Sequence, residues 1–127
     1  MTKPTDTPWG ESQQSREVAP GITRFDTGSH GGYLLSPERR AVMPKPLRDF
    51  QTFAGGNWYE EDCDWAIVVA GLPDLFTTRD VEFALQMIEK GSDRYYAGVA
   101  LSDLARARRV LELDARENSR PPTVTPY

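Results

Sequence analysis

The chain has 127 residues, a formal net charge of −4 and one cysteine. Its length is that of one ordinary domain, and a single cysteine excludes a disulfide within the chain. No apolar run approaches the roughly 18 residues that cross a bilayer, and the polar N-terminus has no apolar targeting segment. The sequence therefore predicts one cytoplasmic domain, in a reducing compartment and without contact with a membrane.

The negative charge is concentrated in the middle of the chain. Residues 51–91 carry two Lys or Arg and eight Asp or Glu, a balance of −6, whereas residues 1–50 and 92–127 each balance to +1. Neither flank has the dense basic stripe of a nucleic-acid groove, so no direct contact with nucleic acid is predicted. The acidic segment favours basic partner surfaces, because opposite charges accelerate association.

The N-terminal part predicts a small antiparallel sheet. Residues 12–18 and 22–27 alternate weakly between apolar and polar side chains, and Pro20-Gly21 between them is typical of a turn. A Gly-rich turn at residues 28–32 leads into a third short strand at residues 33–35. Three strands are therefore expected.

Two short helical segments are expected next. Ser36 is a typical N-cap, and Pro37 suits the first helical position. Residues 47–53 can form a second helical turn, which would place Phe50 and Phe53 on one face.

The stretch 60–71 fits a helix better than a strand. Apolar residues recur in it at positions 65, 68, 69 and 72, which is helical spacing. The carboxylates near its start would stabilise a helix N-terminus by about 0.3–1 kcal/mol each. Ile67, Val68 and Val69 are β-branched, which leaves a buried strand as the open alternative.

Further helices are predicted towards the C-terminus. Residues 79–90 form a helix with Thr77 at its start and Gly91 at its end. Residues 96–111 share one apolar helical face, with a break at Ser102-Asp103 as the alternative. The strongest helix-forming composition lies between residues 103 and 116.

Together these elements predict an α+β fold, with a small three-stranded antiparallel sheet followed by three to four packed helices. The domain is expected to span residues 9–117, after a disordered arm at 1–8 and before a flexible tail at 118–127. Its core is expected to combine apolar side chains from both parts of the chain: Trp9, Phe25, Tyr33, Leu35, Trp65, Val68, Leu72, Val81, Leu85 and Leu104.

The densest chemistry lies in residues 58–65, which hold three aromatic side chains, four carboxylates and the only cysteine. Cys63 is excluded as a nucleophile, because the carboxylates around it repel a thiolate. His30, the only histidine, lies upstream in the Gly-rich turn. A metal site that joined His30 to the carboxylates would depend on that turn meeting the helix, since no local ligand spacing is present. No cofactor, catalytic residue or metal ligand is therefore assigned.

The candidate binding residues combine aromatic and acidic side chains. They are Trp58, Tyr59, Glu60, Glu61, Asp62 and Asp64, together with His30. Such a set is typical of a protein-binding surface, because interface centres favour Trp and Tyr. Spaced carboxylates can also imitate the phosphates of a nucleic acid. The plainer alternative is an acidic helix N-terminus whose aromatic side chains belong to the core.

Two blocks of sequence resemble an uncharacterised family of small domains encoded by bacteriophages, plasmids and other mobile elements. The blocks are Ser29-His30-Gly31-Gly32-Tyr33 and residues 58–66, and the resemblance covers residues 9–76. It implies an accessory protein of a mobile element in the bacterial cytoplasm. Small acidic proteins of that origin often resemble inhibitors of host defence, of the anti-CRISPR or anti-restriction type.

The sequence therefore predicts a non-enzymatic accessory protein that blocks a host or phage protein, for example one in a nucleic-acid-binding complex. This hypothesis expects Trp58 and Tyr59 to be exposed together with several carboxylates. The alternative is an enzyme or metal-dependent domain centred on His30 and the acidic stretch 60–64. It expects His30 within hydrogen-bonding or ligand distance of those carboxylates.

Overall fold

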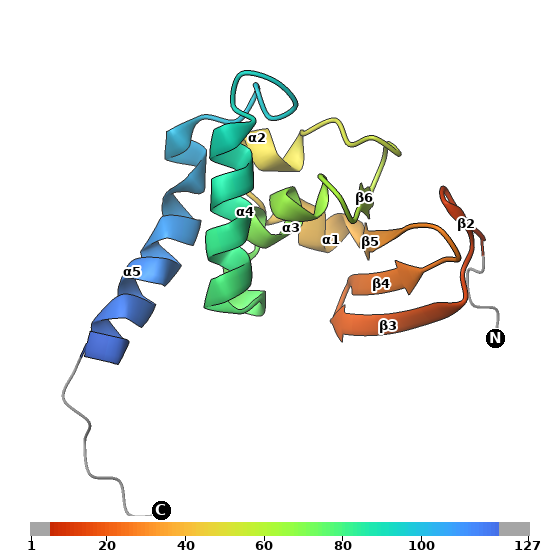
Figure 1. Cartoon of the computed structure of the whole chain (residues 1–127), viewed down its shortest axis with the longest axis horizontal. Helices are drawn as coiled ribbons and strands as arrows, with labels where there is room; N and C mark the ends of the chain where they lie inside the picture. The colour runs from red at the N-terminus through yellow and green to blue at the C-terminus, as the bar shows by residue number, and fades with distance from the viewer. Residues whose placement is uncertain (1–5, 120–127) are drawn as a thin grey trace, which may run out of the picture.

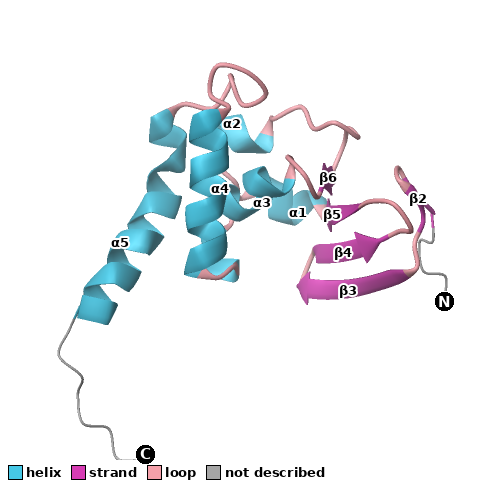
Figure 2. Ribbon diagram, viewed as in Figure 1, coloured by secondary structure: helices cyan, strands magenta, loops and turns pink. Residues whose placement is uncertain are grey.

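The computed structural model describes residues 6–119, and it divides into a sheet on one side and helices on the other (Figures 1 and 2). Four antiparallel strands form the main sheet in the order of the chain: β3 (Gln14–Ala19), β4 (Ile22–Asp26), β5 (Gly31–Leu35) and β6 (Trp58–Glu60). A separate hairpin pairs β1 (Asp6–Thr7) with β2 (Gly10–Glu11). The mixed fold and the antiparallel sheet were predicted, whereas the fourth strand of the main sheet and the separate hairpin were not.

Five α-helices and two 3-10 turns occur in the described part of the chain. The helices are α1 (Pro37–Ala41), α2 (Lys45–Arg48), α3 (Trp65–Gly71), α4 (Thr78–Lys90) and α5 (Ala105–Ser119). The 3-10 turns are η1 (Pro73–Leu75) and η2 (Leu101–Leu104). No helix in residues 6–119 is long and apolar enough to cross a membrane.

The predicted helix over residues 60–71 is wrong at its start. Residues 58–60 form β6, in which Tyr59 lies opposite Tyr33 of β5. Residues 61–64 turn, and the helix begins only at Trp65. Without β6, β5 would be an edge strand with unpaired backbone groups, and pairing with residues 58–60 satisfies them. The carboxylates therefore lie in a strand-to-helix turn and not in the first turn of a helix.

Two other boundaries also differ from the prediction. The apolar face expected over residues 96–111 is interrupted, because residues 91–98 form turns before η2. The alternative break at Ser102-Asp103 is wrong as well, because both residues lie inside η2. The helical turn starts after Ala100, whose backbone N–H donates a hydrogen bond to the Asp103 carboxylate at 2.7 Å. Helix α2 ends at Arg48, so Phe50 and Phe53 lie in the following loop and share no helical face.

The ends of the chain differ from the predicted boundaries within the described residues. Asp6 and Thr7 belong to β1, although the arm was expected to reach residue 8. Helix α5 reaches Ser119, two residues into the expected tail. The rest of the predicted arm and tail, residues 1–5 and 120–127, lies outside the described residues.

Helix α3 is the centre of the core. It lies between the sheet and helices α4 and α5 (Figure 1), and all its residues except Trp65 are buried. Seven of the ten predicted core side chains are buried, namely Phe25, Leu35, Val68, Leu72, Val81, Leu85 and Leu104. Trp9, Tyr33 and Trp65 are only partly buried. For Trp9 this partial exposure matters, because the side chain forms part of a pocket.

Candidate binding pocket

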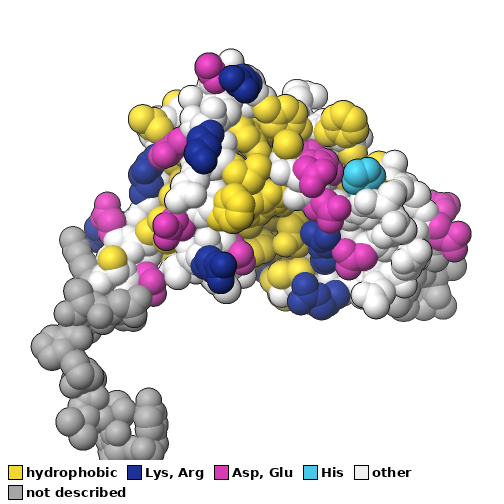
Figure 3. All heavy atoms as spheres, in the orientation of Figure 1, with side chains coloured by type: hydrophobic (Ala, Val, Ile, Leu, Met, Phe, Trp, Pro, Cys, Tyr) yellow, Lys and Arg dark blue, Asp and Glu magenta, His cyan; other side chains and the backbone are white. Residues whose placement is uncertain are grey.

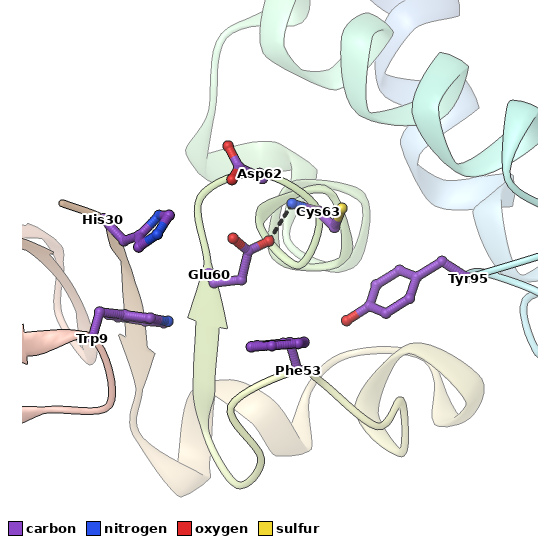
Figure 4. A pocket seen from close by; sticks show the side chains of 7 residues that line it. All are labelled: Trp9, His30, Phe53, Glu60, Asp62, Cys63 and Tyr95. Carbon is purple, nitrogen blue, oxygen red and sulfur yellow. Dashed lines mark hydrogen bonds between the residues drawn. The ribbon is translucent and has the colours of Figure 1, made fainter.

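A pocket of about 330 Å³ opens where the turns of the sheet meet the loops between the helices (Figure 4). Three aromatic rings, two carboxylates, an imidazole and a thiol line it, from segments far apart in the sequence. The lining residues are Trp9, His30, Phe53, Glu60, Asp62, Cys63 and Tyr95. Figure 3 shows the single histidine beside acidic side chains on a face that also carries hydrophobic side chains.

Glycine 32 allows Trp9 to reach this position. A Cβ atom at Gly32 would lie 2.5 Å from the Trp9 ring and would also collide with the Tyr59 carbonyl oxygen. Only a residue without a side chain fits there. Trp9 also packs edge-to-face on Trp58, with 5.6 Å between the ring centroids. Its indole nitrogen is buried and has no hydrogen-bond acceptor within residues 6–119.

Glu60 stabilises a turn with one of its carboxylate oxygens and leaves the other available to a ligand. Its Oε1 atom accepts hydrogen bonds from the backbone N–H groups of Cys63 at 2.5 Å and Asp64 at 3.4 Å. These bonds fix the turn that leads into α3. No hydrogen bond to Oε2 is formed by the described residues. Figure 4 shows that oxygen turned away from Cys63, towards the His30 side of the pocket.

Asp64 is buried and joins three of the segments that line the pocket. Its Oδ2 atom accepts from the backbone N–H groups of Phe53 at 3.0 Å and Glu60 at 3.4 Å, and its Oδ1 atom accepts from the Tyr95 hydroxyl. Burial raises the pKa of Asp64, while these three donors act in the opposite direction. Burial and the Asp64 charge together raise the pKa of Tyr95, which therefore remains a donor. Asp64 thus acts as an anchor and cannot contact a partner.

Tyr59 and Trp58 do not form the exposed pair that was expected. Tyr59 is completely buried, and its hydroxyl has no partner among the described residues. Neighbouring residues of a strand point to opposite faces, so Tyr59 enters the core while Trp58 and Glu60 face the other way. Trp58 is partly buried between Trp9 and Phe25, with 5.4 Å between its ring centroid and that of Phe25.

Glu61 is occupied by an ion pair. Its carboxylate lies 2.7 Å from the Arg24 guanidinium, which also lies 3.0 Å from Asp26. The same guanidinium stacks over the ring of Tyr33, at 5.6 Å from the centroid. Glu61 therefore joins the turn to the sheet and does not line the pocket. Asp62 is exposed and has no ion pair or side-chain hydrogen bond in the described part of the chain.

His30 lines the same pocket as Glu60 and Asp62. Its backbone N–H donates to the Thr27 hydroxyl at 3.0 Å, and its carbonyl accepts from the Thr27 backbone N–H at 2.8 Å. The imidazole has no hydrogen-bond partner within residues 6–119. No group of three His, Cys, Asp or Glu side chains there is arranged to hold a metal ion.

Cys63 is poorly suited to nucleophilic attack. Burial raises the pKa of its thiol, and Glu60, Asp64 and Asp62 raise it further through their charges. The thiolate is the reactive form of cysteine, so these surroundings keep the group protonated. Its carbonyl oxygen instead accepts a 2.7 Å hydrogen bond from the Tyr96 hydroxyl.

The sequence identified His30, Glu60 and Asp62 as candidate residues, and the structure brings them together. The sequence did not identify Trp9, Phe53 and Tyr95 as lining residues. Phe53 is 82% exposed and lies in a Gly-containing loop. A large aromatic residue in a predicted loop could have indicated a binding residue, because functional residues are often found in loops and core packing does not require an aromatic side chain there.

The comparison with known families matches residues 2–120 to a domain of unknown function, DUF7007. The match includes both blocks that carried the resemblance and extends well beyond residue 76, where that resemblance ended. The searches of curated proteins and of solved structures found no match. The chain belongs to the DUF7007 family.

Proposed function

We propose that this domain is a non-enzymatic binding protein, and that its pocket is the centre of the surface that contacts a partner protein. One observation carries the proposal: exposed aromatic rings lie around carboxylates that no cation of the described chain neutralises. Phe53 and Tyr95 are 82% and 39% exposed, and Asp62 has no ion-pair partner. Exposed aromatic side chains and Trp are typical of interface centres.

The charge of the surface defines the kind of partner. Glu60 and Asp62 would attract a basic surface and oppose an acidic one. Cys63 is held in the protonated state by its surroundings, which leaves the pocket without its most obvious nucleophile. A binding role uses the aromatic rings and carboxylates without requiring a reacting group.

The proposal extends to a biological role, that of an accessory protein of a mobile element that blocks a host or phage protein in the bacterial cytoplasm. The resemblance of residues 29–33 and 58–66 to domains from bacteriophages and plasmids supports this extension. A protein of a nucleic-acid-binding complex is a suitable target, because its basic cleft would accept an acidic surface. Inhibition of the anti-CRISPR or anti-restriction type would follow from such occlusion.

The test is a pull-down from a bacterial host lysate with matched variants. Phe53→Asp and Asp62→Lys change the pocket, and both positions are exposed. Leu113→Asp and Glu38→Lys are the controls on α5 and α1, outside the pocket lining: one likewise places a carboxylate at an exposed apolar position, and the other reverses an exposed negative charge. We expect one partner that the two control variants retain and the two pocket variants lose. A partner that Phe53→Asp and Asp62→Lys retain at the wild-type level would contradict the proposal.

A second candidate, an enzyme, rests on the presence of His30, Glu60 and Asp62 in one pocket. A histidine and a carboxylate are suitable as general base and acid when they reach the same substrate. Wild-type protein and His30→Ala can be compared on model ester, phosphoester and peptide substrates. Turnover that His30→Ala lacks, at unchanged partner binding, would favour the enzyme.

A further inference from the structure

The geometry points to an arginine side chain of the partner protein as the ligand of the pocket. This inference rests on the proposed function and specifies its chemistry. The pocket, at about 330 Å³, lies at the lower end of the roughly 300–1,000 Å³ typical of ligand sites. It is large enough for one long side chain with part of its backbone.

The charge of the pocket requires a cation. Glu60 is fixed by the two N–H groups that bind its Oε1 atom, so its second oxygen is held in place beside the pocket. Asp62 adds a second carboxylate, and no Lys or Arg is among the lining residues. The nearby Arg24 is already paired with Asp26 and Glu61. Glu60 is partly buried beside the aromatic rings, which reduces its hydration, and a bound cation that donates hydrogen bonds compensates for that loss.

The aromatic rings distinguish between an arginine and a lysine side chain. Trp9, Phe53 and Tyr95 approach the pocket from three directions in Figure 4. A planar guanidinium stacks on such rings and presents several donors in a fixed arrangement. A lysine ammonium is a compact and strongly hydrated charge, so it gains less from the same walls. The pocket therefore favours arginine over lysine.

The buried indole N–H of Trp9 indicates that the ligand also carries an acceptor. This donor has no partner within residues 6–119, and in Figure 4 the indole nitrogen lies on the side of the ring that faces the pocket. Buried donors are rarely left unpaired. In the complex, a backbone carbonyl of the bound peptide would accept this hydrogen bond. An arginine within a protein supplies that carbonyl next to its cation.

The test uses three capped tripeptides, acetyl-Gly-X-Gly-amide, in which X is arginine, lysine or citrulline. Citrulline has nearly the shape of arginine but no charge. Each peptide is titrated into the ¹⁵N-labelled full chain to about 10 mM, a concentration at which a Kd of 1 mM gives nearly complete binding. The readouts are the indole N–H resonance of Trp9 and the backbone amides of residues 60–63.

We expect the arginine peptide to shift these resonances and to bind at least about tenfold more tightly than the citrulline peptide, with lysine between them. Asp62→Asn and Phe53→Ala should each weaken the arginine peptide several-fold. Glu38→Gln and Phe83→Ala are the matched controls, since they remove a carboxylate and an exposed ring elsewhere, and they should leave its affinity unchanged.

Equal binding of the citrulline and arginine peptides would overturn the inference, as would the absence of shifts at the pocket at the highest concentration. The two proposals fail separately. If the arginine peptide does not bind but Phe53→Asp still loses the partner in the pull-down, only the assignment of arginine as the ligand is contradicted. If the peptide binds the pocket but Phe53→Asp retains the partner, the proposal that the pocket contacts the partner is contradicted.

Discussion

Helix α3 and the walls of the pocket adjoin each other in the structure, but different forces hold them in place. Residues 66–71 of α3 are all buried among apolar side chains. The pocket, by contrast, has three lining residues, Phe53, Glu60 and Tyr95, that are hydrogen-bonded to one buried carboxylate, Asp64. Apolar packing is spread over many small contacts, whereas a polar junction depends on a few directional bonds. The core should therefore control stability, and Asp64 should control the shape of the pocket.

Substitution of Ile67 by Ala should have the largest effect. Ile67 is completely buried in α3, so truncation leaves a cavity and should lower the free energy of unfolding by about 2–5 kcal/mol. Urea denaturation measures the change. Val42→Ala is the matched control: Val42 is 58% exposed, and its truncation should change stability by less than about 0.5 kcal/mol. A similar loss from both variants would show that α3 is not the centre of the core.

Tyr95→Phe should have a smaller but more localised effect. It removes the hydroxyl that donates to Asp64 and leaves the ring against Phe50, whose centroid lies 5.3 Å away. A hydrogen bond to a charged group contributes about 1.5–3 kcal/mol, and that loss should appear in the free energy of unfolding. Hydrogen exchange should also accelerate at the Phe53 amide. Unchanged hydrogen exchange at the Phe53 amide would show that the Tyr95 hydroxyl does not help to hold the loop that Asp64 anchors.

The pH dependence of stability tests Asp64 itself. Because burial raises its pKa in the folded protein above the usual 3.8, folding favours the protonated carboxyl. The resulting stabilisation is complete below pH 3.8 and is lost as the pH rises through the folded pKa. The free energy of unfolding of the wild type, relative to Asp64→Asn, should therefore increase as the pH is lowered towards 4. A relative decrease over that interval would show that the donors outweigh burial.

Phe53→Ala should have the smallest effect on stability. The side chain is 82% exposed, so its removal should change the free energy of unfolding by less than about 0.5 kcal/mol. Its backbone N–H still donates to Asp64, which keeps the loop in position. Thermal denaturation provides the measurement, and partner binding should weaken in the same variant. A large loss of stability would mean that Phe53 packs as a core residue and would remove it from the binding surface.

Part of the candidate site could be predicted from the sequence. His30, Glu60 and Asp62 were identified because a lone histidine and clustered carboxylates are recognisable without a fold. Asp64 was grouped with them, although its burial and its three donors make it an anchor. No local pattern separates these two uses of a carboxylate, since two of the three donors come from residues 11 and 31 positions away along the chain.

The sequence by itself determined the elements whose signals are local. Strands β3, β4 and β5, helix α4 and most of helix α5 follow from periodicity, caps and turn residues. The tertiary structure decided the state of residues 58–60, because their pairing with β5 depends on a strand more than 20 residues earlier. It also decided the pocket, whose aromatic walls come together through the hydrogen bonds of Asp64 and the packing of Trp9 on Gly32. Contacts between distant segments leave no period in a sequence, which is why only the fold reveals them.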